Sequence, residues 1–261
     1  MRLLAAGPTS DRAVAVDAAA VAAVSVAICA AADRLALMSA LVAAVWVARL
    51  ALWARALPVA ERGSPAAELA LLAACTALGA FNDWNTVVRH GVYAYTVPAY
   101  FPRLSIIPLW MLAFWGLVLR LMISLVRWRR LGPPAAARDQ VYLGRRAVER
   151  PWLKLGVELV LLAVTRQLVY RYYADPLWSW LPFAVALAAF FVLFRPDRHD
   201  LRLVALFAVG GPAVEAAYIQ LGHLHRYALG WLGGVPLWIV LWWVLAVLIG
   251  KDLLARAQPA R

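Results

Sequence analysis

The stretch from Leu104 to Val126, LSIIPLWMLAFWGLVLRLMISLV, decides the class of fold. Arg120 is its one charged residue. A helix needs about 20 mostly apolar residues to cross a bilayer, because each residue adds about 1.5 Å along the axis. This stretch therefore predicts a membrane-spanning helix.

The composition extends this interpretation to the whole chain. Of the 261 residues, 65% are hydrophobic and 15% are charged, against about 45–50% and about 25% in soluble domains. A soluble domain of this size could not bury so much apolar surface. We expect an all-α, polytopic transmembrane bundle of about eight helices. The other seven expected spans are 13–32, 35–54, 66–84, 152–172, 177–194, 201–221 and 236–254. The first is Ala-rich and carries Asp17, so seven spans are the alternative.

The net charge of +12 is interpreted as a topology signal. With eight spans, 20 of the 26 Lys and Arg residues fall in the termini, the loops after the second, fourth and sixth helices, and the adjoining helix ends. Basic residues accumulate on the cytoplasmic side of a membrane. We therefore expect a multi-pass protein of a bacterial inner membrane with both termini in the cytoplasm, and no nucleic-acid partner.

The same pattern occurs twice in the chain. LSIIPLWMLAFW at 104–115 resembles LGGVPLWIVLWW at 232–243, with Pro108 matching Pro236 at an offset of 128. Asp83 matches Glu215 at an offset of 132. An offset near 130 puts four helices in each half, so both halves would insert in the same orientation, as in transporters built from parallel repeats. The expected divisions are a first repeat at 1–126, a basic cytoplasmic linker at 127–151 and a second repeat at 152–261.

Asp83 and Glu215 are the candidate catalytic residues. Each lies near the end of a predicted helix, on the side opposite the basic loops. Ionisable groups in hydrocarbon are costly and usually functional. Glu215 has small apolar neighbours, which would keep it protonated and make it a general acid. The alternatives are an ion pair between Glu215 and Arg166 or Arg171, and a solvated loop position for Asp83.

Polar and aromatic residues near these acids could line a substrate pocket. The candidates are Trp84, Asn85, His90, Tyr93, Tyr95, Arg166, Tyr170, Tyr218, His223, His225, Tyr227 and Trp231. A metal at His223 and His225 would need an extended loop, because alternating residues of a helix point apart. We therefore expect no metal and no cofactor. Cys29 and Cys75 are expected to be small buried apolar groups.

The C-terminal segment resembles a known family. Glu215, Gly222, Tyr227 and the run Leu229-Gly-Trp-Leu-Gly-Gly-Val-Pro236-Leu-Trp are similar to the C-terminal motif of integral-membrane carotenoid hydratases. Membrane lycopene cyclases are a looser comparison. The likeness covers about 30 residues. The Gly-x-Tyr-x-Tyr string of that motif is replaced after Gly222, whereas Gly91-Val-Tyr93-Ala-Tyr95 supplies it in the first half.

The resemblance implies acid-initiated chemistry on an apolar isoprenoid or lipid. A protonated carboxyl group would protonate a double bond, and water or an internal double bond would capture the cation. Two other classes fit the sequence. Paired acids in a parallel repeat suit a proton-coupled carrier or lipid translocase, and polar groups that only pair helices suit a structural subunit. Membrane lipids are the other expected partners, and the oligomeric state is open.

Overall fold

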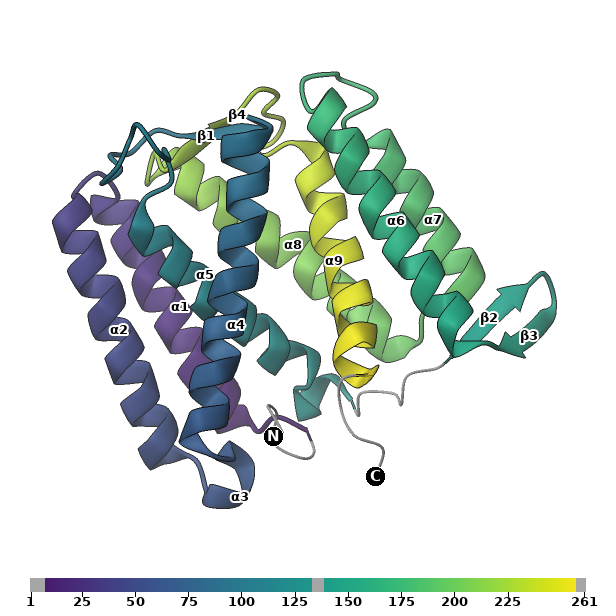
Figure 1. Ribbon diagram of the computed structural model, residues 1–261. Helices are drawn as coiled ribbons and strands as arrows, with labels where there is room; N and C mark the ends of the chain where they lie inside the picture. The colour runs from purple at the N-terminus through teal and green to yellow at the C-terminus, as the bar shows by residue number, and fades with distance from the viewer. Residues whose placement is uncertain (1–7, 133–138, 257–261) are drawn as a thin grey trace. The chain divides into compact units, whose positions relative to one another are not determined.

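The computed structural model describes residues 8–132 and 139–256, and within these ranges the chain is mainly helical (Figure 1). The long helices are α1 (Asp11–Ala31), α2 (Leu35–Ala56), α4 (Pro65–Asp83), α5 (Leu109–Val126), α6 (Pro151–Tyr172), α7 (Leu181–Phe194), α8 (Arg198–Gln220) and α9 (Leu237–Arg256). The short elements are α3 (Val59–Arg62), η1 (Trp84–Arg89), β1 (Tyr93–Tyr95), η2 (Arg129–Leu131), β2 (Gln140–Leu143), β3 (Arg146–Glu149) and β4 (His225–Tyr227).

The eight long helices coincide with the eight expected apolar segments, which confirms the all-α class. Six of them, α1, α2, α4 with η1, α5, α8 and α9, are long and apolar enough to cross a membrane. The chain is therefore a multi-pass membrane protein. The helix α7 is apolar but short, and α6 carries charged side chains along its length: Lys154, Glu158, Arg166 and Arg171.

Two helices begin later than expected. Residues 104–108 lie outside α5, which begins at Leu109, so Pro108 is the residue before the helix and not part of its first turn. The span expected from 177 begins at Leu181, because the Asp175 carboxylate accepts from the backbone N–H groups of Leu177 and Trp178 and fixes a turn there.

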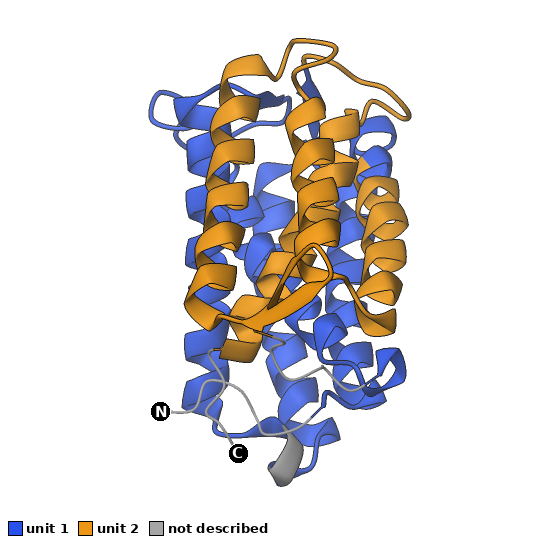
Figure 2. Ribbon diagram, turned by 90° about the vertical axis from the view of Figure 1, so that its right-hand side faces the viewer, with its two compact units in different colours: residues 1–133, 216–227 blue, residues 134–215, 228–261 orange. Residues whose placement is uncertain are grey.

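The chain forms two compact units, coloured separately in Figure 2. Unit 1 comprises residues 1–133 and 216–227. Within it α1, α2, α4 and α5 pack side by side as a bundle (Figure 1). Small residues let the helices approach closely: a Cβ atom on Gly116 would lie 2.8 Å from the Trp46 ring and 2.2 Å from the Thr76 hydroxyl. Close approach at small residues is the usual basis of helix packing in membranes.

Unit 2 comprises residues 134–215 and 228–261. The helix α7 packs on α6, on α9 and on the hairpin formed by β2 and β3. Its core is aromatic: the Phe183 ring stacks on Trp238 and meets Trp242 edge-on, with centroid separations of 6.2 Å in both cases. Aromatic pairs of this kind add about 0.5–1.5 kcal/mol each beyond the area they bury.

One helix contact occurs in both units at positions that match in the proposed repeat. In unit 1, a Cβ on Gly79 would lie 2.3 Å from Trp115 Cβ. In unit 2, a Cβ on Gly211 would lie 2.7 Å from the Trp243 ring. The glycines differ by 132 positions and the tryptophans by 128, the two offsets found in the sequence. Equivalent positions therefore make the same glycine–tryptophan contact.

The strands β1 and β4 are also equivalent positions, and they pair with each other inside unit 1. The antiparallel register sets Tyr93 against Tyr227, Ala94 against Arg226 and Tyr95 against His225. Ala94 and Arg226 differ by 132 positions, so the pairing is centred on residues that match in the repeat.

The glycine contacts give a test with an internal control. We expect Gly79→Ala and Gly211→Ala to destabilise the protein by about 1–3 kcal/mol each, the usual cost of forcing extra atoms into a packed core. Gly210 has nothing within 4 Å of its Cβ position, so Gly210→Ala should be neutral or stabilising, because Ala is the better helix former. Thermal unfolding in detergent measures all three. A Gly211→Ala variant as stable as Gly210→Ala would show that the contact is loose.

The charge distribution predicts the topology. Reporter fusions at Arg130 and after the last residue should both give a cytoplasmic signal, and a fusion at Tyr100 an external one, because basic loops stay inside. A cytoplasmic signal at Tyr100 would contradict the eight-span topology.

Candidate functional site

Asp83 ends α4 and is fully buried. Both of its carboxyl oxygens accept a hydrogen bond from a phenol: Tyr93 Oη donates to Oδ1 at 2.5 Å, and Tyr95 Oη donates to Oδ2 at 2.6 Å. Such short bonds are typical of a charge-assisted O–H···O⁻ contact. The two phenols therefore stabilise the carboxylate form of a group that burial alone would keep neutral.

The chain between Asp83 and Tyr93 explains why the tyrosines reach this carboxyl group. Residues Trp84–Arg89 continue α4 as a π-helix, a rare form that is frequently found at functional sites. Gly91 then adopts φ +62°, a conformation that favours glycine, and the chain reverses into β1. Tyr93 and Tyr95 are two residues apart on a strand and share one face. Both side chains thus return to Asp83.

The strand β4 adds two rings to the same group. Tyr93 lies 5.4 Å from His225 and 5.2 Å from Tyr227 between ring centroids, and Tyr95 lies 6.1 Å from His225. His225 is buried. Burial and the nearby Asp83 charge raise the pKa of Tyr95 well above its ordinary value, so its phenol remains a donor. We call Asp83, Tyr93, Tyr95, His225 and Tyr227 the Asp83 cluster.

The structure thus brings together five of the predicted site residues. Glu215 is partly buried in α8. Asp83, for which a solvated loop position was the alternative, is the more enclosed acid.

The remaining predicted residues lie in several environments. Tyr218 shares a 2.6 Å hydrogen bond with Ser25 and meets the Phe114 ring. His223 is exposed and adopts φ +45°, while Asn85 and His90 are partly buried in and after η1. Trp84 is 47% exposed and Trp231 71%. In unit 2, the Arg166 guanidinium lies over the rings of Tyr170 and Trp242.

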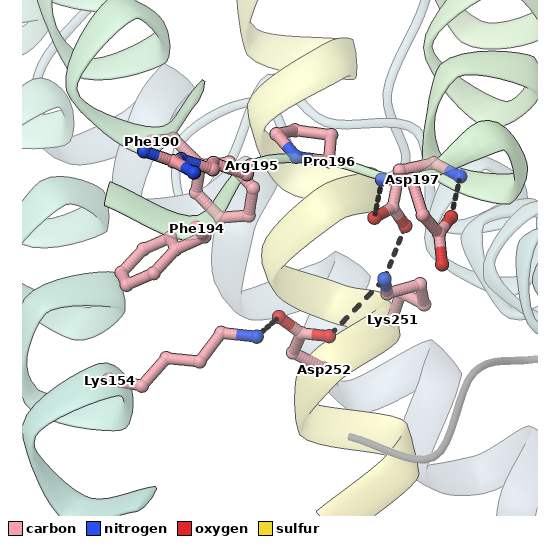
Figure 3. A pocket seen from close by; sticks show the side chains of 9 residues that line it. Lys154, Phe190, Phe194, Arg195, Pro196, Asp197, Lys251 and Asp252 are labelled. Carbon is pink, nitrogen blue, oxygen red and sulfur yellow. Dashed lines mark hydrogen bonds and ion pairs between the residues drawn. The ribbon is translucent and has the colours of Figure 1, made fainter. Parts of the chain in front are cut away.

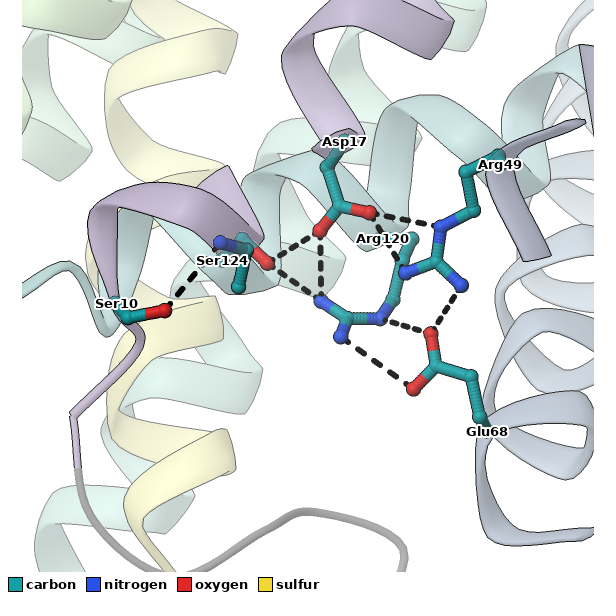
Figure 4. A network of polar contacts seen from close by, with 7 residues as sticks. Ser10, Asp17, Arg49, Glu68, Arg120 and Ser124 are labelled. Atoms are coloured by element: carbon teal, nitrogen blue, oxygen red, sulfur yellow. Dashed lines mark hydrogen bonds and ion pairs between the residues drawn. The ribbon is translucent and has the colours of Figure 1, made fainter. Parts of the chain in front are cut away.

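The structure contains two buried ion networks that the sequence analysis did not identify. In unit 1, Arg49 and Arg120 each bridge Asp17 and Glu68, with N···O distances of 2.5–3.1 Å (Figure 4). Ser124 donates to Asp17. Two carboxylates face two guanidinium groups, so the network is electrically balanced. Asp17, the acidic residue of the first expected span, therefore belongs to an ion network. Its arginine partners were counted in the sequence only as topology charges.

The second network lies in unit 2 and borders a pocket (Figure 3). Lys154 contacts Asp252 at 2.6 Å and Glu158 at 3.7 Å, and Lys251 bonds to Asp200. Asp197, His199 and Asp200 also place ligand atoms within 4.8 Å of one another. Asp197 and Asp200 accept from each other's backbone N–H at the start of α8, and Lys251 engages Asp200. These contacts show that the two aspartates cap the start of α8.

The balanced network predicts a large effect of neutralisation. Asp17→Asn should cost about 3–5 kcal/mol of unfolding free energy, because it strands buried arginine charge. Asp33 is exposed between α1 and α2, so Asp33→Asn serves as the control and should leave stability unchanged. Denaturation in detergent measures both, and equal stabilities would mean that the network is solvated.

Comparison with protein-family models, with curated proteins and with solved structures gives no match for this chain.

Proposed function

We propose that the chain is an integral-membrane enzyme that acts on an apolar isoprenoid or lipid by acid-initiated chemistry, with Asp83 as the general acid. One observation carries the proposal: a fully buried carboxyl group at a π-helical junction, with a phenol donating to each oxygen. Structural carboxylates in helix bundles usually pair with a cation, as Asp17 does here.

The proposed reaction starts from protonated Asp83. The carboxyl group gives its proton to a carbon–carbon double bond, and the electron pair of that bond forms the new C–H bond. Tyr93 and Tyr95 then stabilise the carboxylate that remains, since hydrogen bonds to a charged acceptor contribute about 1.5–3 kcal/mol. The neighbouring carbon becomes a cation. The faces of Tyr93, Tyr95 and Tyr227 can stabilise it through their ring quadrupoles.

The carbocation can be consumed in two ways, and each completes the reaction with the release of one proton. Water adds and releases a proton, which gives an alcohol, or an internal double bond adds and a neighbouring C–H bond releases a proton, which gives a ring. In either case a released proton restores the acid, and no cofactor is required.

The surroundings of the acid suit an apolar substrate. Phe81 and Trp84, which flank Asp83 along the chain, are 62% and 47% exposed, and their rings lie 6.4 Å apart. Val88 is also exposed. In a membrane these side chains would face lipid, so an isoprenoid could approach from the bilayer. The resemblance to carotenoid hydratases supports the same class of substrate. The Gly-x-Tyr-x-Tyr string at 91–95 supplies the two tyrosines that donate hydrogen bonds to Asp83.

The repeated glycine–tryptophan contact favours a second candidate, a proton-coupled carrier or lipid translocase. Parallel repeats are common in transporters, whose sites lie between the halves. In that case Asp83 would bind and release a proton during transport, without forming a C–H bond.

Deuterium incorporation separates the two. Purified protein in liposomes is given an acyclic carotene or a polyprenol in D₂O, and products are analysed by mass spectrometry. The enzyme proposal expects one carbon-bound deuterium per turnover. A hydration product also gains one molecule of water, whereas a cyclisation product gains no water. Asp83→Asn should abolish incorporation, because an amide cannot donate the proton.

Two matched variants test the roles of the phenols. Tyr93→Phe and Tyr95→Phe each remove one donor to Asp83 and should slow the reaction roughly 10- to 100-fold. Tyr142→Phe, on the exposed hairpin of unit 2, is the control. If no product forms and the liposomes show Asp83-dependent proton flux, the carrier proposal replaces the enzyme proposal.

A further inference from the structure

Among the described residues, the ion network of unit 2 has three buried carboxyl groups and two buried ammonium groups. Its carboxyl groups are Glu158, Asp200 and Asp252, and its ammonium groups are Lys154 and Lys251. All five are at most 9% exposed. An unbalanced charge is expensive in a poorly hydrated place and is usually removed by a change of protonation.

The surplus carboxyl group belongs to the pair Glu158 and Asp252. Lys251 engages Asp200 and lies 3.4 Å from Asp252, and Lys154 lies 2.6 Å from Asp252 but 3.7 Å from Glu158. Neither oxygen of Glu158 receives a hydrogen bond within the described residues, although the side chain is fully buried. The Glu158 and Asp252 carboxyl groups share the single Lys154 ammonium group, which lies 3.7 Å from an oxygen of the first and 2.6 Å from an oxygen of the second. Two acceptors in this position need a proton between them.

The other titratable groups around this pair have contacts of their own. Arg195 lies over the Tyr142 ring and donates to the Gly144 carbonyl. Arg256 pairs with Asp139. Asp197 caps α8 with Asp200. His199 is buried in the first turn of α8, and its imidazole is another group that can bind a proton, so it needs a control.

We propose that unit 2 binds one exchangeable proton between Glu158 on α6 and Asp252 on α9. Asp252 lines the pocket with Lys154, Lys251, Asp200 and Phe194 (Figure 3). Glu158 is not part of this lining and contacts it through Lys154. The site is independent of the proposed function of Asp83.

Unit 1 supplies a matched reference without the excess charge. Glu68 in the first turn of α4 corresponds to Asp200 in the first turn of α8. Glu68 and Asp200 differ by 132 positions, the repeat offset. Arginine does not release its proton in proteins, so two guanidinium groups fix the charge of the unit 1 network. Lysines and a surplus acid leave unit 2 able to titrate.

Infrared spectroscopy of the full chain in lipid nanodiscs tests the proposal. The spectra are recorded in an Asp83→Asn background, so a proton on the proposed catalytic acid does not contribute. We expect the carbonyl stretch of a protonated carboxyl group at neutral pH, lost in Glu158→Gln and in Asp252→Asn. It should be retained in Asp17→Asn and in His199→Gln.

Thermal unfolding gives a second readout. The folded protein holds a proton that the exposed carboxyl group of the unfolded chain releases, so stability should fall as pH rises from mildly acidic to mildly alkaline. Glu158→Gln should remove this slope and keep the melting temperature near that of the parent. Asp17→Asn should lower the melting temperature at every pH.

Four results would overturn the proposal. They are a carboxyl band that survives Glu158→Gln and Asp252→Asn, loss of that band in His199→Gln, a Glu158→Gln variant that melts as early as Asp17→Asn, and a stabilisation of the parent by sodium ions that Glu158→Gln abolishes. The last result would assign a metal cation to the site. Because Asp83 is absent throughout, failure here leaves the enzyme proposal untouched.

Discussion

Charge buried inside a helix bundle is the constraint on which this structure depends. Transferring an ion out of water costs several kcal/mol even after relaxation, and attraction offsets this only when the geometry is good. Arg49 and Arg120 meet the condition by bridging Asp17 and Glu68 from two sides. Four helices of unit 1 contribute one member each. The network therefore fixes which helices are neighbours and how they are rotated.

This constraint also explains why Asp83 stands apart. It is buried like Asp17, yet its two carboxyl oxygens accept hydrogen bonds from the phenols of Tyr93 and Tyr95, which carry no positive charge. Phenols keep their protons and add no charge, so the carboxyl group can change protonation without leaving a stranded cation behind. A guanidinium partner would hold the same group permanently ionised. The choice of partner separates an acid that can react from one that only joins helices.

The sequence predicted the helices well, because twenty-residue apolar segments with few charges have one solution in a membrane. Asp83, Tyr93, Tyr95, His225 and Tyr227 were all among the candidates, since ionisable residues near hydrocarbon are conspicuous. The sequence did not predict that these five residues lie together. Glu215 was preferred for its small neighbours, but the π-helix and the glycine turn that return two tyrosines to Asp83 depend on backbone geometry. The composition of the ion networks depends on how each helix is rotated about its own axis. A helix that is apolar on nearly all faces, such as α1, does not show in its sequence which face packs inward.

The π-helix has a consequence for how the acid site can change. A π-turn accommodates one more residue than an α-turn, and such segments are read as single-residue insertions into a regular helix. Deleting one residue from Trp84–Arg89 would restore α-helical geometry and turn everything that follows by about 100° around the axis. The chain would then enter β1 in a different direction, and Tyr93 and Tyr95 would no longer donate hydrogen bonds to Asp83. The apolar pattern of the helix would be unchanged. A change of one residue in length can therefore remove the site from a chain that keeps its fold.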